Sequence, residues 1–318
     1  MMAASTHSGP GEMAQNPDLG QRLVLDPNVT RVQIDAALTR LGFVQDDDAS
    51  ELAASWRMFG TRPFVVWTFN PVFRLSVLDV GTVPPAQRAQ IIAALPILGL
   101  VELERRLKSN LPGDVLLALW ALVDREEVGH LPMLRKMAQK AAQPLADEIT
   151  LAMGALGKID AQRRELIGGL RLVAQTAGEV IDALADPNVA RSLLVTPDEC
   201  ASLFTPDIAA DVAELLQTKP HNLGRGMEGR VVNGDHIVAA QAGLLRWHNM
   251  FSRAFPMGYR DAAGWMSAQT VWVAWKTETA PEHTMTYDGL VLCDGQWRLF
   301  PRAYRAVAQV MTARQTRH

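Results

Sequence analysis

The chain has 318 residues, of which 48% are hydrophobic and 20% charged, and its formal net charge is -3. This composition excludes a disordered or membrane-embedded protein, and the small net charge argues against a nucleic-acid-binding surface. A length above ~250 residues favours more than one hydrophobic core.

The chain begins with residues 1–20, MMAASTHSGPGEMAQNPDLG, which we expect to be a flexible tail. This stretch has neither the basic start nor the apolar run of an export signal. The most apolar run, residues 91–103, is too short to span a bilayer and contains a proline. Together with an excess of arginine over lysine that suggests a GC-rich genome, these features predict a cytoplasmic bacterial protein without a membrane partner.

Residues 21–84 have the pattern of a small α+β cap. Thr30 can cap a helix in RVQIDAALTRLGF, whose apolar stripe ends at Gly42. A polar loop, DDDASELAAS, follows. Two β-rich runs separated by Asn70-Pro71 predict a hairpin over residues 64–80.

Residues 85–187 are rich in leucine and alanine at helical spacing. Prolines and glycines interrupt the pattern about once per helix, the last break falling near Gly157. We expect antiparallel helices joined by short loops, over residues 100–110, 114–124, 130–142, 145–157 and 161–185.

Two of these predicted helices share a pattern. GDVLLALWALVD, residues 113–124, aligns with DEITLAMGALGK, residues 147–158, at a shift of 34 residues, so that Leu117 matches Leu151 and Ala118 matches Ala152. Helix pairs that recur at such intervals are typical of solenoids, in which each pair buries its apolar face on a neighbour. The region around residues 100–187 resembles HEAT repeats, and this resemblance implies a scaffold that binds other proteins. The alternative is an ordinary helical bundle in an alanine-rich chain.

Residues 188–318 predict a second α+β domain. Thr196 and Glu199 form a T-x-x-E capping box, and a second helix start follows at Thr205-Pro206. Residues 219–235 read as a loop or short ribbon. We expect one amphipathic helix over residues 237–255 and then strands in TVWVAWK, TMTYDGLVLC and QWRLFPRAY. Asp294-Gly295 suits the two-residue turn of a hairpin.

A helix followed by antiparallel strands that end in D-G-x-W-x-L resembles the NTF2-like cone fold, and this resemblance implies a pocket enclosed by helix and sheet. The residues that would line such a pocket are mostly aromatic: Trp247, His248, Tyr259, Arg260, Asp261, Trp272, Trp275, Tyr287 and Trp297. No motif assigns a catalytic role to any of them.

Other site chemistry has little support in the sequence. The seven histidines are scattered without metal-ligand spacing, and no serine-nucleophile or phosphate-loop motif occurs. Residues 224–229, GRGMEG, match G-x-G-x-x-G but lack the preceding apolar strand. Cys200 and Cys293 have no paired spacing and predict two buried free thiols. We expect no metal and no cofactor.

The fold class predicted from these patterns is mainly α with α+β ends. It consists of HEAT-like helix pairs between the N-terminal cap and a C-terminal helix-plus-sheet domain. The leading hypothesis for function is a non-enzymatic scaffold or adaptor that binds another protein, within a bacterial secretion or toxin-immunity system. The alternative is a small-molecule-binding protein or enzyme with an aromatic pocket in the C-terminal domain.

Overall fold

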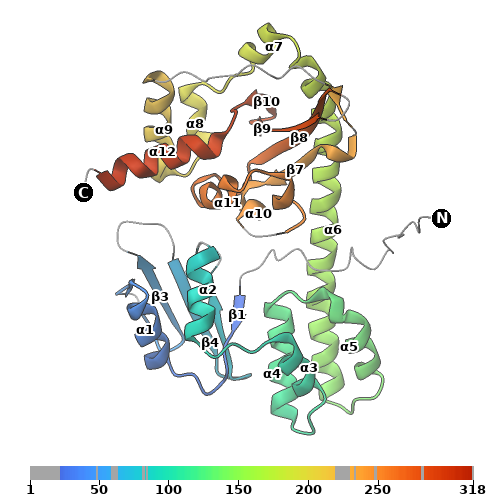
Figure 1. Ribbon diagram of the computed structural model, residues 1–318. Helices are drawn as coiled ribbons and strands as arrows, with labels where there is room; N and C mark the ends of the chain where they lie inside the picture. The colour runs from blue at the N-terminus through green and yellow to red at the C-terminus, as the bar shows by residue number, and fades with distance from the viewer. Residues whose placement is uncertain are drawn as a thin grey trace, which may run out of the picture. The chain divides into compact units, whose positions relative to one another are not determined.

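The computed structural model describes residues 22–47, 49–58, 64–80, 83, 85–218, 230–232, 234–246, 249–280 and 283–316. The expected N-terminal tail and the GRGMEG stretch lie outside these residues. The chain divides into two compact units, Met1–Arg163 and Arg164–His318. Both combine helices with an antiparallel sheet, which confirms the α+β class (Figure 1).

The first unit contains a five-stranded antiparallel sheet with the order β1-β5-β4-β3-β2. The elements of this sheet and its two flanking helices are β1 (Arg22–Val24), α1 (Arg31–Arg40), β2 (Phe43–Gln45), β3 (Ala53–Met58), β4 (Phe64–Asn70), β5 (Leu75–Asp79) and α2 (Pro85–Ala94). The hairpin expected over residues 64–80 is confirmed as β4 and β5. Thr30 caps α1 in a capping box with Gln33, as its position predicts. The polar loop is shorter than expected, because β3 already begins at Ala53.

One face of this sheet is buried along its length, whereas the second face is buried at β1 and β5 and exposed at Val44, Arg57 and Thr68. Along β5, Leu78 and Val80 pack in a core with α1 and α2, whereas Leu75 and Val77 pack in a second core with the following helices. Such alternation follows from the two-residue period of a strand. The near-continuous apolar run of β5 thus reflects burial on two sides.

The helices of the second core are α3 (Leu100–Leu107), α4 (Pro112–Asp124), the 3₁₀ turn Val128–His130, α5 (Leu131–Ala138) and the first part of α6 (Leu145–Ala183). The break expected near Gly157 is wrong, because α6 is one continuous helix of 39 residues. Gly154 and Gly157 sit inside it with open space where a Cβ would be. A glycine weakens a helix by only ~1 kcal/mol, which neighbouring packing can offset.

The two segments that share a sequence pattern lie in α4 and α6 and contribute to one core. Their burial differs at several matched positions: Leu117 is buried, but Leu151 is 60% exposed, and Ala121 is buried where Ala155 is half-buried. Trp120 of α4 also donates a hydrogen bond from Nε1 to Glu148 of α6 at 3.2 Å. The shared pattern therefore places both helices on the same core, with different contacts along each helix.

The second unit begins within α6 and contains a second antiparallel sheet, also of five strands. Its elements are α7 (Pro187–Ser192), the 3₁₀ turn Pro197–Glu199, α8 (Cys200–Leu203), α9 (Pro206–Thr218), β6 (Arg230–Val231), the 3₁₀ turn Gly234–His236, β7 (Val238–Gln241), α10 (Ala242–Leu245), the 3₁₀ turn Ser252–Ala254, α11 (Gly258–Ala262), the 3₁₀ turn Ala263–Trp265, β8 (Val271–Ala280), β9 (His283–Cys293), β10 (Gln296–Leu299) and α12 (Ala303–Thr316). The strand order is β10-β9-β8-β6, and β7 pairs with another part of β8.

Two of the predictions for this unit are wrong. Residues 237–255 do not form one helix: Val238–Gln241 is a strand, and short helical turns follow. QWRLFPRAY, residues 296–304, was expected to be a strand throughout. The strand ends at Leu299, and the helix α12 begins at Ala303. The turn at Asp294-Gly295 is confirmed, since both residues have positive φ angles, 50° and 76°.

A glycine in the middle of β9 allows the chain after β10 to approach the sheet. Gly289 has φ +98°, and the pairing of β8 with β9 shifts at this point. Its carbonyl accepts a hydrogen bond from the Phe300 N–H, at 2.7 Å. A Cβ here would lie 2.1 Å from the Phe300 carbonyl oxygen, so a side chain cannot be accommodated.

Candidate interaction cleft

Those aromatic residues singled out from the sequence that the structure describes lie on two faces of the second sheet. Trp272 pairs with Val291, and Trp275 pairs with Tyr287. Because side chains alternate along a strand, Trp272 and Trp275 face opposite sides. The expected single pocket therefore divides into two groups of residues.

On the first face, Tyr259 and Trp272 belong to a packed aromatic cluster. Their ring centroids lie 6.0 Å apart in an edge-to-face arrangement, and Phe204, Phe255 and Tyr304 also contact the group. Tyr259 and Trp272 are 1% and 0% exposed, so these two rings fill core rather than line an open surface. The arrangement is that of a well-packed aromatic core.

Asp288 is a buried carboxylate beneath this cluster. Its Oδ1 accepts hydrogen bonds from the Tyr259 hydroxyl at 2.9 Å and from the Arg302 N–H at 3.0 Å. Burial raises the pKa of Asp288, while these hydrogen bonds and the nearby Arg302 and Arg305 oppose the shift. The pKa of Tyr259 is raised well above 10, mainly by burial and then by the Asp288 charge. Arg302 has a positive φ of 55°, so Asp288 holds an unusual backbone conformation where β10 leads to α12. These contacts are structural.

On the second face, Trp275 stacks on Tyr287 with ring centroids 5.8 Å apart. Trp297 pairs with Leu292, which in turn pairs with Val271, and so lies on this same face. Of the remaining candidates, Arg260 is half-buried and Asp261 exposed, both on α11. Trp247 and His248 lie outside the described residues.

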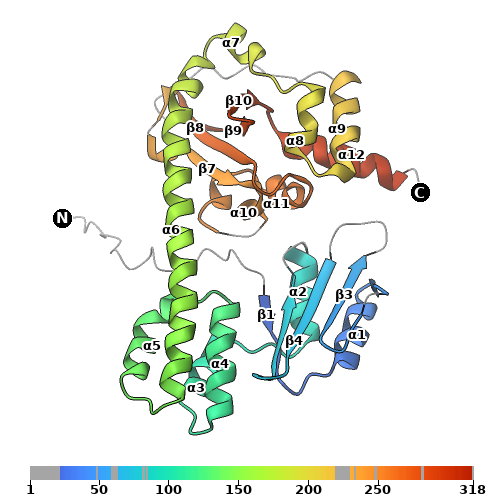
Figure 2. The ribbon, with the colours of Figure 1, turned by 180° about the vertical axis from the view of Figure 1, so that it is seen from behind.

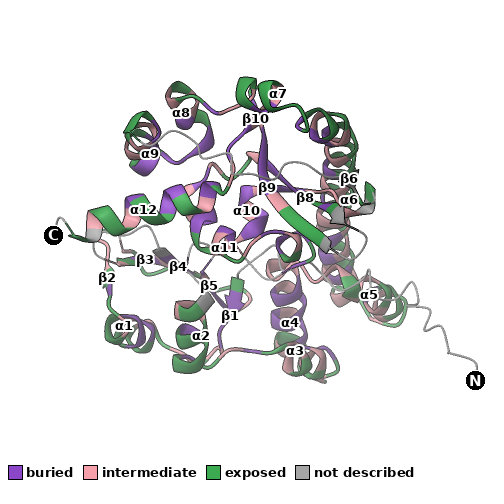
Figure 3. Cartoon of the chain, turned by 45° about the horizontal axis from the view of Figure 1, so that its top comes forward, coloured by how far each residue is buried: buried purple, intermediate pink, exposed green. Residues whose placement is uncertain are grey.

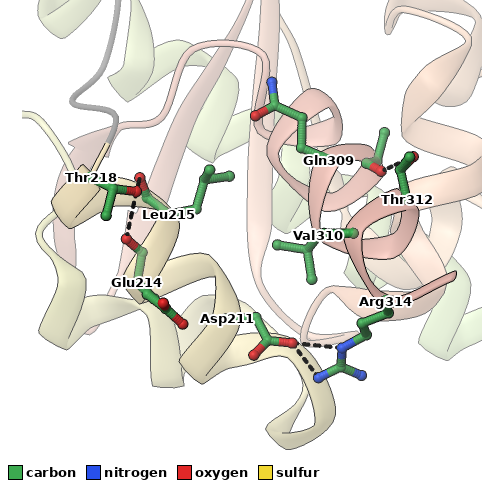
Figure 4. Close-up of a pocket in the computed structure, with 10 residues that line it drawn as sticks. Asp211, Glu214, Leu215, Thr218, Gln309, Val310, Thr312 and Arg314 are labelled. Atoms are coloured by element: carbon green, nitrogen blue, oxygen red, sulfur yellow. Dashed lines mark hydrogen bonds and ion pairs between the residues drawn. The ribbon is translucent and has the colours of Figure 1, made fainter. Parts of the chain in front are cut away.

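A surface cleft in this unit lies between α9 and α12, and we call it the α9–α12 cleft. It has a volume of about 610 Å³ and is lined by Asp211, Glu214, Leu215, Thr218, Ala308, Gln309, Val310, Thr312, Ala313 and Arg314. Leu215 and Val310 extend into the space between the helices (Figure 4). Polar side chains surround them, so the cleft has an apolar floor and a polar rim.

The local sequence explains why these two helices pack against each other. In α9, Ile208, Val212 and Leu216 are buried; in α12, Ala303, Val307 and Val310 are buried. Each helix thus has a buried side at a spacing of three or four residues and an exposed side, visible in Figure 3. Leu215 is half-buried and Val310 belongs to the buried side of α12, and both line the cleft.

One end of the cleft is closed by an ion pair. The Nε of Arg314 donates to Asp211 Oδ2 at 2.6 Å, and the same guanidinium donates to the Asp207 carbonyl oxygen. This places the C-terminal end of α12 against the start of α9. Both charged side chains remain about one-third exposed, so the pair orients the helices more than it stabilises them.

The charge of the cleft is not balanced. Arg314 compensates Asp211, whereas Glu214 is exposed and makes no ion pair with any residue in the described part of the chain. Its α9 neighbours Asp207 and Asp211 are acidic, and α9 contains no basic residue. The described lining of the cleft therefore carries one uncompensated carboxylate, Glu214.

Groups that could support catalysis or metal binding are scarce among the described residues. They include no cluster of three or more histidine, cysteine or acidic side chains that could hold a metal ion. Cys200 and Cys293 are free and buried, as the sequence predicts. Burial raises the pKa of Cys200 to about 11, so its thiol is a poor nucleophile at neutral pH. None of the helices in the described residues is long and apolar enough to cross a membrane.

The cleft could have been found in part from sequence. The start of α9 at Thr205-Pro206 is predicted, and the C-terminal stretch AYRAVAQVMTAR carries its own helical period in Ala303, Ala306, Val307 and Val310. Reading QWRLFPRAY as a strand concealed that period. Which two helices meet could not be read from either segment.

Comparison of the chain with protein families, with curated proteins and with solved structures finds no match in any of the three.

Proposed function

We propose that this protein is a non-enzymatic adaptor that binds another protein through the α9–α12 cleft. The observation that carries the proposal is the combination of an apolar floor, Leu215 and Val310, with an uncompensated carboxylate, Glu214, in the lining. Two helices that separate along one edge offer a groove into which a third, amphipathic helix can lay its apolar face. The partner helix would carry a basic residue opposite Glu214.

The buried groups with altered pKa values support binding rather than catalysis. Asp288 and Tyr259 hydrogen-bond to each other and to the backbone inside the core, and none of their atoms is among those lining the cleft. An enzyme would be expected to place its perturbed groups in the cavity that takes the substrate. We also propose that the protein acts within a bacterial secretion or toxin-immunity system, a context in which a partner-binding protein fits.

Site-specific photo-crosslinking in the source cell tests the proposal. A photoreactive amino acid replaces Ala313, which is exposed in the cleft, and in a second strain it replaces Ala94, which is exposed at the end of α2. We expect one discrete protein adduct from position 313 and not from position 94. Identical adducts at both positions, or none at 313, would contradict the proposal.

A charge variant then tests the cleft with the identified partner. Glu214→Lys should weaken binding about tenfold, since ~1.4 kcal/mol of charge complementarity corresponds to that factor. Gln217→Lys is the matched control, because Gln217 is exposed on the same helix but does not line the cleft. Equal effects of the two variants would indicate non-specific attraction to α9.

A further inference from the structure

A second pocket lies in the same unit, between α6 and the segment around β7. It has a volume of about 340 Å³, within the range of ~300–1,000 Å³ that small-molecule sites occupy. Figure 2 shows α6 running beside β7 and β8. We call this cavity the α6–β7 pocket.

The lining of this pocket changes from apolar to polar between its floor and its mouth. Leu170, Ala239 and Phe251 are 4%, 3% and 6% exposed and form the floor. Arg171, Gln175 and Met250 are exposed at the mouth. A ligand that fits this gradient has an apolar body and one polar end.

The charge at the mouth specifies that polar end. Among the described lining residues, Arg171 alone has a charged side chain, and none has a carboxylate. Arg171 also makes no ion pair with another residue in the described part of the chain. A guanidinium binds a carboxylate through two parallel N–H donors, so it favours an anionic head group.

We infer that the α6–β7 pocket binds a small apolar monocarboxylate, with the hydrocarbon chain on Leu170 and Phe251 and the carboxylate at Arg171. The volume favours a free small molecule over a helix of a partner protein. This site is separate from the α9–α12 cleft, whose described lining holds two carboxylates, Asp211 and Glu214, and which we assign to a basic partner. The two assignments can therefore fail independently.

Calorimetric titration of the purified full chain with decanoate tests the inference, with decanol and decylamine as probes of the same length. We expect saturable binding of one decanoate per chain. Decanol should bind at least tenfold more weakly, and decylamine should not bind. Equal binding of decanoate and decanol would remove the role of Arg171, and no saturable binding of decanoate would overturn the site.

Variants locate the binding. Arg171→Gln, at an exposed position that leaves the core intact, should weaken decanoate about tenfold and leave decanol unchanged. Ala174→Trp, which fills the pocket, should abolish binding of both, provided that its circular dichroism matches wild type. Arg191→Gln is the control, since Arg191 is exposed on α7 away from the pocket lining. If Arg191→Gln weakens decanoate as much as Arg171→Gln, the attraction is general and the inference is wrong.

Discussion

The two antiparallel sheets have the same order of strands and helix along the chain, but they differ in whether their buried polar side chains have hydrogen-bond partners. In each, three consecutive strands are followed by a helix: β3, β4, β5 and α2 in the first unit, and β8, β9, β10 and α12 in the second. In the first sheet, Trp56 Nε1 donates to Asp35 at 2.8 Å and Trp67 Nε1 donates to Ser76 at 2.7 Å.

The second sheet is less completely paired. Trp272 Nε1 and Thr277 Oγ1 are buried without a hydrogen-bond partner among the described residues, and Asp288 is a buried carboxyl group. Both candidate binding sites also lie in this unit. The two sheets therefore differ in how many buried polar atoms have a hydrogen-bond partner, which makes the second sheet the place to test what such an unpaired atom costs.

The largest effect expected in the second sheet comes from Gly289→Ala. The new Cβ would collide with the Phe300 carbonyl, so we expect a loss of at least ~3 kcal/mol in the free energy of unfolding, measured by urea denaturation. The matched control is Gly295→Ala, which has positive φ but open space and should cost ~1 kcal/mol. Similar costs for both would mean that the close approach at Gly289 does not occur.

The next effect concerns the buried carboxylate. Asp288→Ala leaves the Tyr259 hydroxyl and the Arg302 N–H without an acceptor, which should cost about 3 kcal/mol. Asp288→Asn keeps an acceptor oxygen and should be close to wild type at neutral pH. A loss as large as that of the alanine variant would show that the negative charge itself is needed.

The difference in stability between Asp288→Asn and wild type should depend on pH. Because the folded-state pKa of Asp288 is raised above 3.8, the folded protein favours the protonated carboxyl. Its contribution to stability is therefore full below pH ~3.8 and is lost as the pH rises through the folded pKa. Asp288→Asn removes this loss, so its stability relative to wild type should improve on going from acid to neutral pH. The opposite slope would contradict the burial argument.

The smallest effect compares one tryptophan in each sheet. Trp67→Phe leaves the buried Ser76 hydroxyl without its donor, whereas Trp272→Phe removes a donor that has no partner in the described structure. Both lose volume, so the difference isolates the hydrogen bond. Trp67→Phe should be more destabilising by ~1 kcal/mol in chemical denaturation. Equal losses would remove the contrast between the sheets.

Local signals in the sequence predicted the elements that they control. The Thr30 helix cap, the Asn70-Pro71 turn and the Asp294-Gly295 turn each depend on a few adjacent residues, and each is confirmed. The helix expected over residues 237–255 failed because Val238 and Ala240 pair with Ala274 and Trp272 of β8, which lie far along the chain. Tertiary pairing overrode the local apolar period there.

The candidate sites depended even more on distant contacts. The aromatic residues of the C-terminal region were expected to line one pocket, but the register of β8 and β9 decides which rings share a face. The α9–α12 cleft needs Arg314 to reach Asp211 over 103 positions. The repeat in α4 and α6 and its resemblance to HEAT repeats remain predictions.

The continuous helix α6 has a practical consequence for dissecting the molecule. The boundary between the two units falls at Arg163 and Arg164, inside a helix whose backbone hydrogen bonds run without interruption from Leu145 to Ala183. Arg163 is itself anchored to Glu126 of the first unit. A fragment that ends or starts at this boundary would expose a severed helix end with about four unpaired carbonyl or amide groups. Expression of either half should therefore retain all of α6, so that each fragment keeps an intact helix on which to fold.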